Sequence, residues 1–268
     1  MTRILALSAA LAAVAVTGVF AHDLFLKLGS YHVPPHSSVA VLVLNGTFSQ
    51  SEGPVARDRI AHLTLLSPAG RVRLDTAALT PGDTSVLALR TGEPGTYVIG
   101  LSTLPRRIDL AADDFNQYLA LDGIPDLLIE RAAKKQLGQP ARERYSKHVK
   151  ALLQVGNDRS DSFGAVLGYP AELVPLENPY ALSLGGVLRV RALVKGEPVA
   201  NQLLLAGGET AAGEPITEQS VRTDPQGTAR FTLDQPGRWY IKFIHMAPAR
   251  TEDLDYESTW ATLTFEVR

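Results

Sequence analysis

Cysteine is the first absence in this chain of 268 residues, which contains none. Without cysteine there is no disulfide framework, and zinc, haem or thiol chemistry that depends on a cysteine ligand is excluded. The fold must therefore be held together by ordinary apolar cores, and 45% of the residues are apolar. A chain of this length can bury one large core or two of ordinary size.

A strong charge of either sign is also missing, because 26 basic and 28 acidic residues leave a formal net charge of −2. No basic stripe is visible, which argues against nucleic acid as a partner. Only one apolar run, residues 4–19, approaches the length of a membrane span. We therefore expect no membrane span in the mature chain. The Gly-x-Ser-x-Gly elbow, the phosphate-binding loop, the dinucleotide-binding turn and the His-Glu-x-x-His motif are all absent from the sequence. These absences favour a non-catalytic protein over an enzyme.

The one long apolar run has the form of a secretory signal peptide. Arg3 precedes it, and the small residues Val19 and Ala21 stand at the two positions that a signal peptidase reads. The run is short for a membrane anchor, and no stop-transfer charges follow it. We therefore expect residues 1–21 to be removed between Ala21 and His22, which places the mature protein in the periplasm or outside the cell. The absence of cysteine favours a bacterial periplasm.

Cleavage at this point would make His22 the first residue of the mature chain. A terminal histidine carries a free amine and an imidazole on one residue, and together they can chelate copper, nickel or zinc. A second candidate follows from alternation in residues 239–245, which places Trp239 and His245 on one predicted core face. His245 would then emerge at the rim of a sandwich, shortly before a run of carboxylates in residues 252–257. These are the ligand types of a transition-metal site, and the alternative is a hydrogen-bonded histidine beside a solvated acidic loop.

Short strand-like segments separated by Gly/Pro turns occupy both ends of the mature chain, residues 22–108 and residues 161–268. Within them, residues 228–243 echo residues 85–101, because each has a strand, a Pro-Gly pair and a strand that begins with an aromatic residue. Regularly spaced short strands of this kind predict antiparallel sandwiches. We therefore expect a mainly β protein with two immunoglobulin-like or Greek-key β-sandwich domains of related topology.

The segment between them, residues 109–160, shows helical rather than alternating periodicity. Phe115 and Tyr118 lie at helical spacing, and residues 141–153 read as a further helix with His148 on its polar, solvated side. The sequence therefore predicts a short α-helical insertion of two or three helices between the two β domains.

Several motifs together resemble a bacterial family of unassigned role. They are Ala21-His22-Asp23-Leu-Phe-Leu, Pro105-Arg-Arg107, Asp114-Phe-Asn-Gln-Tyr-Leu119 with Asp122-Gly123, Arg142-Glu-Arg-Tyr-Ser-Lys147 with Lys150-Ala-Leu-Leu153, Leu176-Glu-Asn-Pro-Tyr180, Pro236-Gly-Arg-Trp-Tyr-Ile241 with Ile244-His-Met246, and Glu257-Ser-Thr-Trp-Ala-Thr-Leu-Thr-Phe265. As a set they resemble the domain of unknown function 4198 family, some of whose members are described as NikM-like periplasmic components of cobalt or nickel uptake. The resemblance implies a secreted, β-rich protein that handles a transition metal. Of the histidines, only His22 and His245 lie in matching segments, so the expected metal ligands are these two with Asp255 and Glu257.

Three functions remain open at this point. The first is a periplasmic binding protein that captures nickel, cobalt or copper and delivers it to a membrane metal transporter. The second is a non-catalytic envelope module that recognises another envelope protein or a glycan through its loops and sheet edges. The third is a copper-dependent oxidative enzyme, in which His22 and a second histidine hold the metal and leave positions open for oxygen chemistry.

Overall fold

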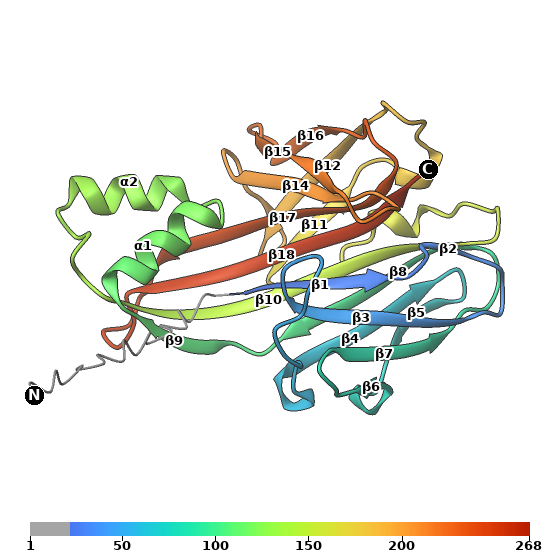
Figure 1. Cartoon of the computed structure of the whole chain (residues 1–268), viewed down its shortest axis with the longest axis horizontal. Helices are drawn as coiled ribbons and strands as arrows, with labels where there is room; N and C mark the ends of the chain where they lie inside the picture. The colour runs from blue at the N-terminus through green and yellow to red at the C-terminus, as the bar shows by residue number, and fades with distance from the viewer. Residues whose placement is uncertain (1–21) are drawn as a thin grey trace, which may run out of the picture.

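The computed structural model describes residues 22–268, so the predicted signal peptide lies outside the described residues. Three β-sheets pack as layers, and two α-helices cover one end of the molecule (Figure 1). The mainly β, sandwich-type fold predicted from the sequence is confirmed. Over the described range, neither helix is long and apolar enough to cross a membrane.

The central sheet has ten strands, and three long ones run side by side in its middle (Figure 1). β10 (Ala141–Val155) pairs in parallel with β18 (Tyr256–Val267), which pairs antiparallel with β17 (Gly237–Pro248). The other members are β14 (Leu203–Glu209) and β15 (Pro215–Arg222) beyond β17; β8 (Gly95–Thr103), β4 (Ile60–Ser67) and β5 (Gly70–Arg73) beyond β10; and the short β2 (His32–Val33) and β9 (Arg106–Leu110), which also pair with β10. Strands from both halves of the chain therefore share one sheet.

Two four-stranded sheets cover the central one. The first contains β1 (Asp23–Leu28), β3 (Ser38–Gly46), β7 (Ser85–Arg90) and β6 (Leu79–Thr80), and the second contains β11 (Ala171–Pro175), β12 (Val187–Val194), β13 (Glu197–Pro198) and β16 (Thr228–Thr232). In β10, Lys147 donates to the carbonyl of His22 just before β1, whereas Lys150 pairs with Glu172 of β11. Residues three apart in a strand point to opposite faces, so the outer sheets lie on opposite sides, which we call the β1 face and the β11 face.

The helices α1 (Ala112–Leu121) and α2 (Pro125–Ala133) lie on the β1 face, at the end of the central sheet away from the C-terminus (Figure 1). Phe115, Tyr118 and Leu119 repeat at helical spacing and are all buried, which explains the amphipathic pattern of α1. The ring of Tyr118 stacks on Trp260 of β18, with centroids 5.6 Å apart. The helices therefore close a small apolar cluster of their own over β17 and β18.

The two segments of similar sequence, residues 85–101 and 228–243, form equivalent connections between sheets. β7 leads into β8 and β16 leads into β17, so each connection takes the chain from an outer sheet into the central sheet. Gly95 and Gly237 begin the inner strands with φ angles of 148° and 151°. A Cβ atom would lie 2.4 Å from Pro68 Cγ at the first and 2.4 Å from the carbonyl oxygen of Glu209 at the second. The Pro-Gly pairs thus mark the points where only glycine allows the chain to cross between sheets.

The helix predicted for residues 141–153 is wrong, because this segment forms β10. β10 is an inner strand that is covered on both faces, so every residue from Ser146 to Val155 is buried whichever way it points. A strand buried on both faces loses the alternation of apolar and polar residues by which strands are recognised. The helical part of the predicted insertion is therefore confined to α1 and α2.

The prediction that His148 lies on the solvated side of a helix is also wrong. Its side chain is 2% exposed, and its ring nitrogens lie 2.8 Å and 3.0 Å from the hydroxyl oxygens of Ser102 and Ser146. Burial, with a smaller contribution from His62, lowers the pKa of His148 to about 3. A neutral ring held by two hydroxyls makes this histidine a structural residue.

Candidate functional site

His22 lies immediately before β1, and both its side chain and its main chain are held by the fold. Nε2 of the imidazole is 3.0 Å from Oε2 of Glu52, and the backbone carbonyl accepts a hydrogen bond from Nζ of Lys147. Glu52 is itself positioned, because its backbone N–H donates to the carbonyl of Asn45 in β3 at 2.9 Å. The side chain of His22 remains 28% exposed, so the ring is fixed but reachable from solvent.

The contact with Glu52 decides which nitrogen of His22 is available. A carboxylate accepts hydrogen bonds and cannot donate them, so Nε2 carries the proton in this contact. In the neutral ring, Nδ1 then keeps its lone pair. Nδ1 and the α-nitrogen are the two atoms through which a terminal histidine closes a chelate ring on one metal ion. A carboxylate partner on the other nitrogen fixes the orientation of such an imidazole toward a metal.

A buried ion cluster anchors the strand that follows His22. Nζ of Lys242 pairs with Asp23 and lies 3.4 Å from Oδ1 of Asp122 at the end of α1. Burial raises the pKa of Asp122 to about 6. Burial opposes the charge on Lys242, but the carboxylates of Asp23 and Asp122 outweigh it and raise the pKa of the amine. The first residue of β1 is therefore tied to the central sheet and to the helices by charge.

Two more titratable groups are buried close to this cluster. Nζ of Lys147 lies 5.4 Å from the ring centroid of Tyr145 and 4.9 Å from that of Trp260, and burial lowers the pKa of Lys147 to about 8. Glu143 accepts hydrogen bonds from Ser258 and, at 3.2 Å, from Tyr118. Burial raises the pKa of Glu143 to about 7. The β1 face thus carries an ionisable core between the outer sheet and the helices.

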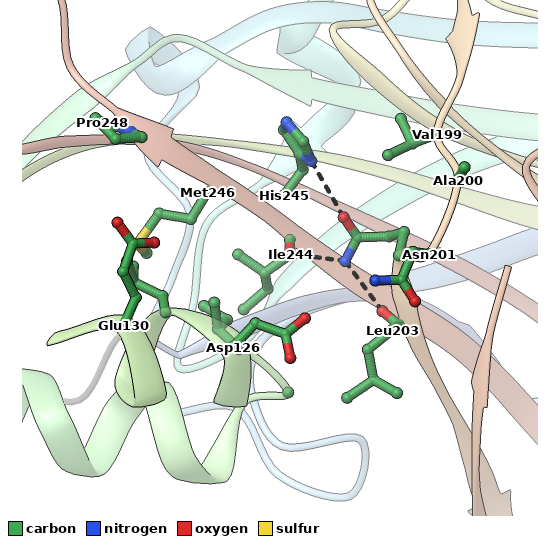
Figure 2. Close-up of a pocket in the computed structure, with 14 residues that line it drawn as sticks. Asp126, Glu130, Val199, Ala200, Asn201, Leu203, Ile244, His245, Met246 and Pro248 are labelled. Atoms are coloured by element: carbon green, nitrogen blue, oxygen red, sulfur yellow. Dashed lines mark hydrogen bonds between the residues drawn. The ribbon is translucent and has the colours of Figure 1, made fainter. Parts of the chain in front are cut away.

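His245 of β17 has a different partner. Its Nδ1 is 3.1 Å from Oε1 of Gln202, and Nε2 of Gln202 donates to the backbone carbonyls of Leu203 and Ile244, each at 3.1 Å; these contacts are the dashed lines in Figure 2. The two carbonyls can only accept, so the amide orientation is fixed and Oε1 must face His245. Nδ1–H therefore donates, and Nε2 is the free base. Burial and the charge of Lys195 lower the pKa of His245, which favours the neutral ring.

The structure places His22 and His245 on opposite faces of the central sheet. Lys242, which binds the neighbour of His22, lies three positions before His245 in β17, so their side chains point in opposite directions. In Figure 2 the ring of His245 also points away from Asp126 and Glu130, the carboxylates of α2. The two histidines therefore do not meet in one site.

The predicted carboxylate ligands are both bound by arginine. Oδ2 of Asp255 accepts from the backbone N–H and Nε of Arg142 at 2.8 Å and 3.0 Å, and Oδ1 accepts from Nη2 at 3.1 Å. Glu257 forms an ion pair with Arg144. Glu257 and His245 line one cavity of about 360 Å³ on the β11 face, and Asp255 lies outside it. Within residues 22–268, no three His, Cys, Asp or Glu side chains gather as ligands of one metal ion.

The residues that orient the two histidines were missed in the sequence. Glu52 precedes a glycine in a loop 30 positions from His22, and Gln202 follows the β13 turn 43 positions before His245. Neither stands in a motif, and both contacts depend on how the strands pack. Lys147 and Lys150 stand in the segment that was predicted as a helix, so their burial on opposite faces of β10 was not foreseen.

Comparisons with known proteins place the chain in a family without naming an activity. No curated protein matches the sequence. A solved chain described as a tetra-tandem repeat in the extending region of a large adhesion protein matches with 11% identity and a TM-score of 0.22, over 92% of this chain and 49% of that one. This chain thus spans about half the length of that chain, and a TM-score this low defines no shared fold. The association with cobalt or nickel uptake stays a prediction. The sequence model of the domain of unknown function DUF4198 matches residues 19–247, and this protein therefore belongs to the DUF4198 family.

Proposed function

We propose that this protein, once its signal peptide is removed, is a periplasmic or secreted protein that binds a transition metal ion through His22. The contact between His22 and Glu52 carries the proposal, because it holds Nε2 at 3.0 Å and leaves Nδ1 and the α-nitrogen for a metal. Copper, nickel and cobalt are the candidate ions, since each accepts nitrogen ligands. Copper is the tightest binder of the three in the divalent series.

The main chain next to His22 is held by contacts within the protein itself. β1 pairs with β3 from Asp23 onward, where Asp23 stands opposite Gly46, and Lys147 holds the carbonyl of His22. The ring is oriented by Glu52. A ligand pair that is held in place before binding loses little conformational entropy when the ion arrives. This pre-organisation supports an affinity above that of a flexible terminal peptide.

The proposed ion would keep open coordination positions. His245 lies on the β11 face, and Asp255 and Glu257 are bound by arginine, so none of these predicted ligands joins His22. Open positions suit a protein that captures an ion and passes it to a membrane metal transporter. They would also serve a copper-dependent oxidative enzyme, whereas the envelope interaction module needs no metal.

The experiment that tests the proposal is a calorimetric titration of copper, nickel and cobalt into two forms of the protein. One form begins at His22 with a free α-amine, and the other is the same chain with this amine acetylated. We expect the acetylated form to bind about a hundredfold more weakly, because its α-nitrogen is an amide and no longer an amine ligand. Equal and weak binding by both forms would contradict a terminal site and favour the envelope interaction module.

Glu52 provides the second test. In the form that begins at His22, Glu52→Ala should weaken binding by about tenfold or more, as is usual when the partner of a metal-bound imidazole is removed. Glu52→Gln keeps an acceptor oxygen for Nε2–H and should retain most of the affinity. Consumption of oxygen or peroxide by the copper-loaded protein, in the presence of a reductant, would favour the oxidative enzyme over metal transport.

A further inference from the structure

A second site lies on the β11 face, in the cavity of about 360 Å³ beside the ring of His245. Strands β10, β17 and β18 form its floor, and the end of β12 with the turn that follows forms one side. Much of the lining is apolar and comes from Pro105, Pro170, Val194 and Ala247. A cavity of this size and character accommodates a small organic molecule.

The charged groups of this cavity carry a net positive charge. Lys195 is exposed in the turn after β12, and its charge acts on His245. Arg144 binds Glu257 through Nη2, and its guanidinium has further N–H donors beyond that contact. The cavity therefore holds two cations, Lys195 and Arg144, and one carboxylate, Glu257, whose charge Arg144 neutralises. The neutral imidazole of His245 adds no charge. This balance attracts an anion and repels a metal cation.

The floor of the cavity offers one acceptor and one unsatisfied hydroxyl. The bond from Nδ1–H to Gln202 leaves Nε2 of His245 as a base that accepts a hydrogen bond. Thr259 stands directly opposite His245 in the β17–β18 pair, and its buried Oγ1 has no hydrogen-bond partner within the described part of the chain. A ligand that donates a hydrogen bond is therefore better matched to this floor than a purely anionic one.

We propose that the His245 cavity binds a small organic anion with an apolar body and a hydroxyl group. The anionic group lies toward Lys195 and the free N–H groups of Arg144, the body packs on the apolar lining, and the hydroxyl donates to Nε2 of His245. The site is on the opposite face from His22 and does not depend on the metal proposed there.

Three probes separate the features of such a ligand: 4-hydroxybenzoate, benzoate without the hydroxyl, and 4-methylphenol without the charge. Each is titrated into the chain that begins at His22, in the presence of a chelator, and is followed by calorimetry and by the backbone amide resonances of His245 and Thr259. We expect 4-hydroxybenzoate to bind most tightly and each of the other two to bind about tenfold more weakly.

Two lysines give a matched pair of variants. Lys195 and Lys135 both have a positive φ, 53° and 59°, and both are exposed, but only Lys195 lines the cavity. Asparagine tolerates this backbone conformation, so Lys195→Asn removes the charge without straining the turn. This variant should weaken both benzoates by about fivefold and leave 4-methylphenol unchanged, because only a charged probe uses the ammonium group. Lys135→Asn should change none of the three.

His245→Asn tests the acceptor. The asparagine amide can still donate to Gln202, as Nδ1–H does, but nothing replaces Nε2. This variant should weaken the two phenols and spare benzoate. Equal binding of 4-methylphenol and 4-hydroxybenzoate, unaffected by Lys195→Asn, would overturn the proposal. So would the failure of every probe to shift His245 and Thr259, or tight nickel or zinc binding that His245→Asn abolishes.

Discussion

The two faces of the central sheet hold histidines in opposite electrostatic settings. On the β1 face, the ring of His22 donates from Nε2 to a carboxylate, Glu52, and keeps the lone pair of Nδ1 for a metal ion. On the β11 face, the ring of His245 contacts the amide of Gln202, and burial together with the charge of Lys195 lowers its pKa, which favours the neutral ring. The imidazole of His22 is thus arranged to bind a cation, whereas the imidazole of His245 is arranged to accept a hydrogen bond. The partner of the ring, more than the histidine itself, indicates what each site binds.

The two faces also differ in their buried carboxylates. The largest effect on the free energy of unfolding is expected on the β11 face. Glu172 is buried against Lys150 at 3.0 Å and accepts three backbone N–H groups of residues 167–169. We expect Glu172→Gln to lower the free energy of unfolding by about 3–5 kcal/mol, since it leaves a buried ammonium without its counter-ion. Urea denaturation measures this change. Glu177→Gln, at the more exposed pair with Arg189, is the control and should cost less than about 1 kcal/mol.

The metal affinities of the two histidine variants give the next largest difference. His22→Ala should reduce copper or nickel affinity by about a hundredfold, because both the ring and its chelate are lost. His245→Ala should change it by less than about threefold, since its ring lies on the other face. Calorimetry on chains that begin at residue 22 measures both values. A comparable loss in the two variants would show that the sites are coupled and would break the comparison between the faces.

Replacing Glu143 on the β1 face should change the stability in the opposite direction from replacing Glu172. Its pKa is raised by burial to about 7, so the folded state binds a proton more readily than the unfolded state. Stability therefore falls as the pH rises from about 4.5 to 7. Glu143→Gln removes this cost and should stabilise the protein by about 1–3 kcal/mol at pH 8 and by little at pH 4.5. Thermal unfolding across this pH range is the measurement, and a variant that is destabilised at pH 8 would contradict the prediction.

The smallest effect concerns the tautomer of His245. With Gln202 present, Nδ1 carries the proton, whereas Gln202→Ala removes the acceptor that selects this form. We expect the ¹⁵N shifts of the ring to change from a single Nδ1–H form to a mixture of tautomers. The shifts of His148, whose two ring nitrogens are held by serines, serve as the internal reference. Unchanged shifts for His245 would mean that a group other than Gln202 fixes the ring.

The strands at the ends of the chain were predictable because their residues alternate and their turns carry Gly and Pro. The connections at Gly95 and Gly237 could even be paired with each other, since a crossing between sheets requires the same local backbone. The strand β10 (Ala141–Val155) could not be recognised in this way. Burial of both its faces removes alternation, and the partners that allow Lys147 and Lys150 to be buried are distant in sequence.

The candidate site was predictable only in part for a related reason. His22 and His245 were identified as unusual from their positions in the sequence, and the structure gives each an orienting partner. Their expected convergence failed because alternation along a strand tells which residues share a face but not which outer layer covers that face. Asp255 and Glu257 could not be assigned either, since Arg142 and Arg144 bind them from 113 residues away.

The position of β18 has a consequence for how the molecule is made. The strand that ends at Val267 lies between β10 and β17, in the middle of the central sheet and not at its edge. Its parallel partner β10 precedes it by more than a hundred residues, and contacts of such long range form slowly. During synthesis or translocation, the sheet therefore stays divided, with unpaired strand edges, until residues 256–267 arrive. A chain shortened by this one strand would be split through its centre, which makes premature termination far more damaging here than loss of an edge strand.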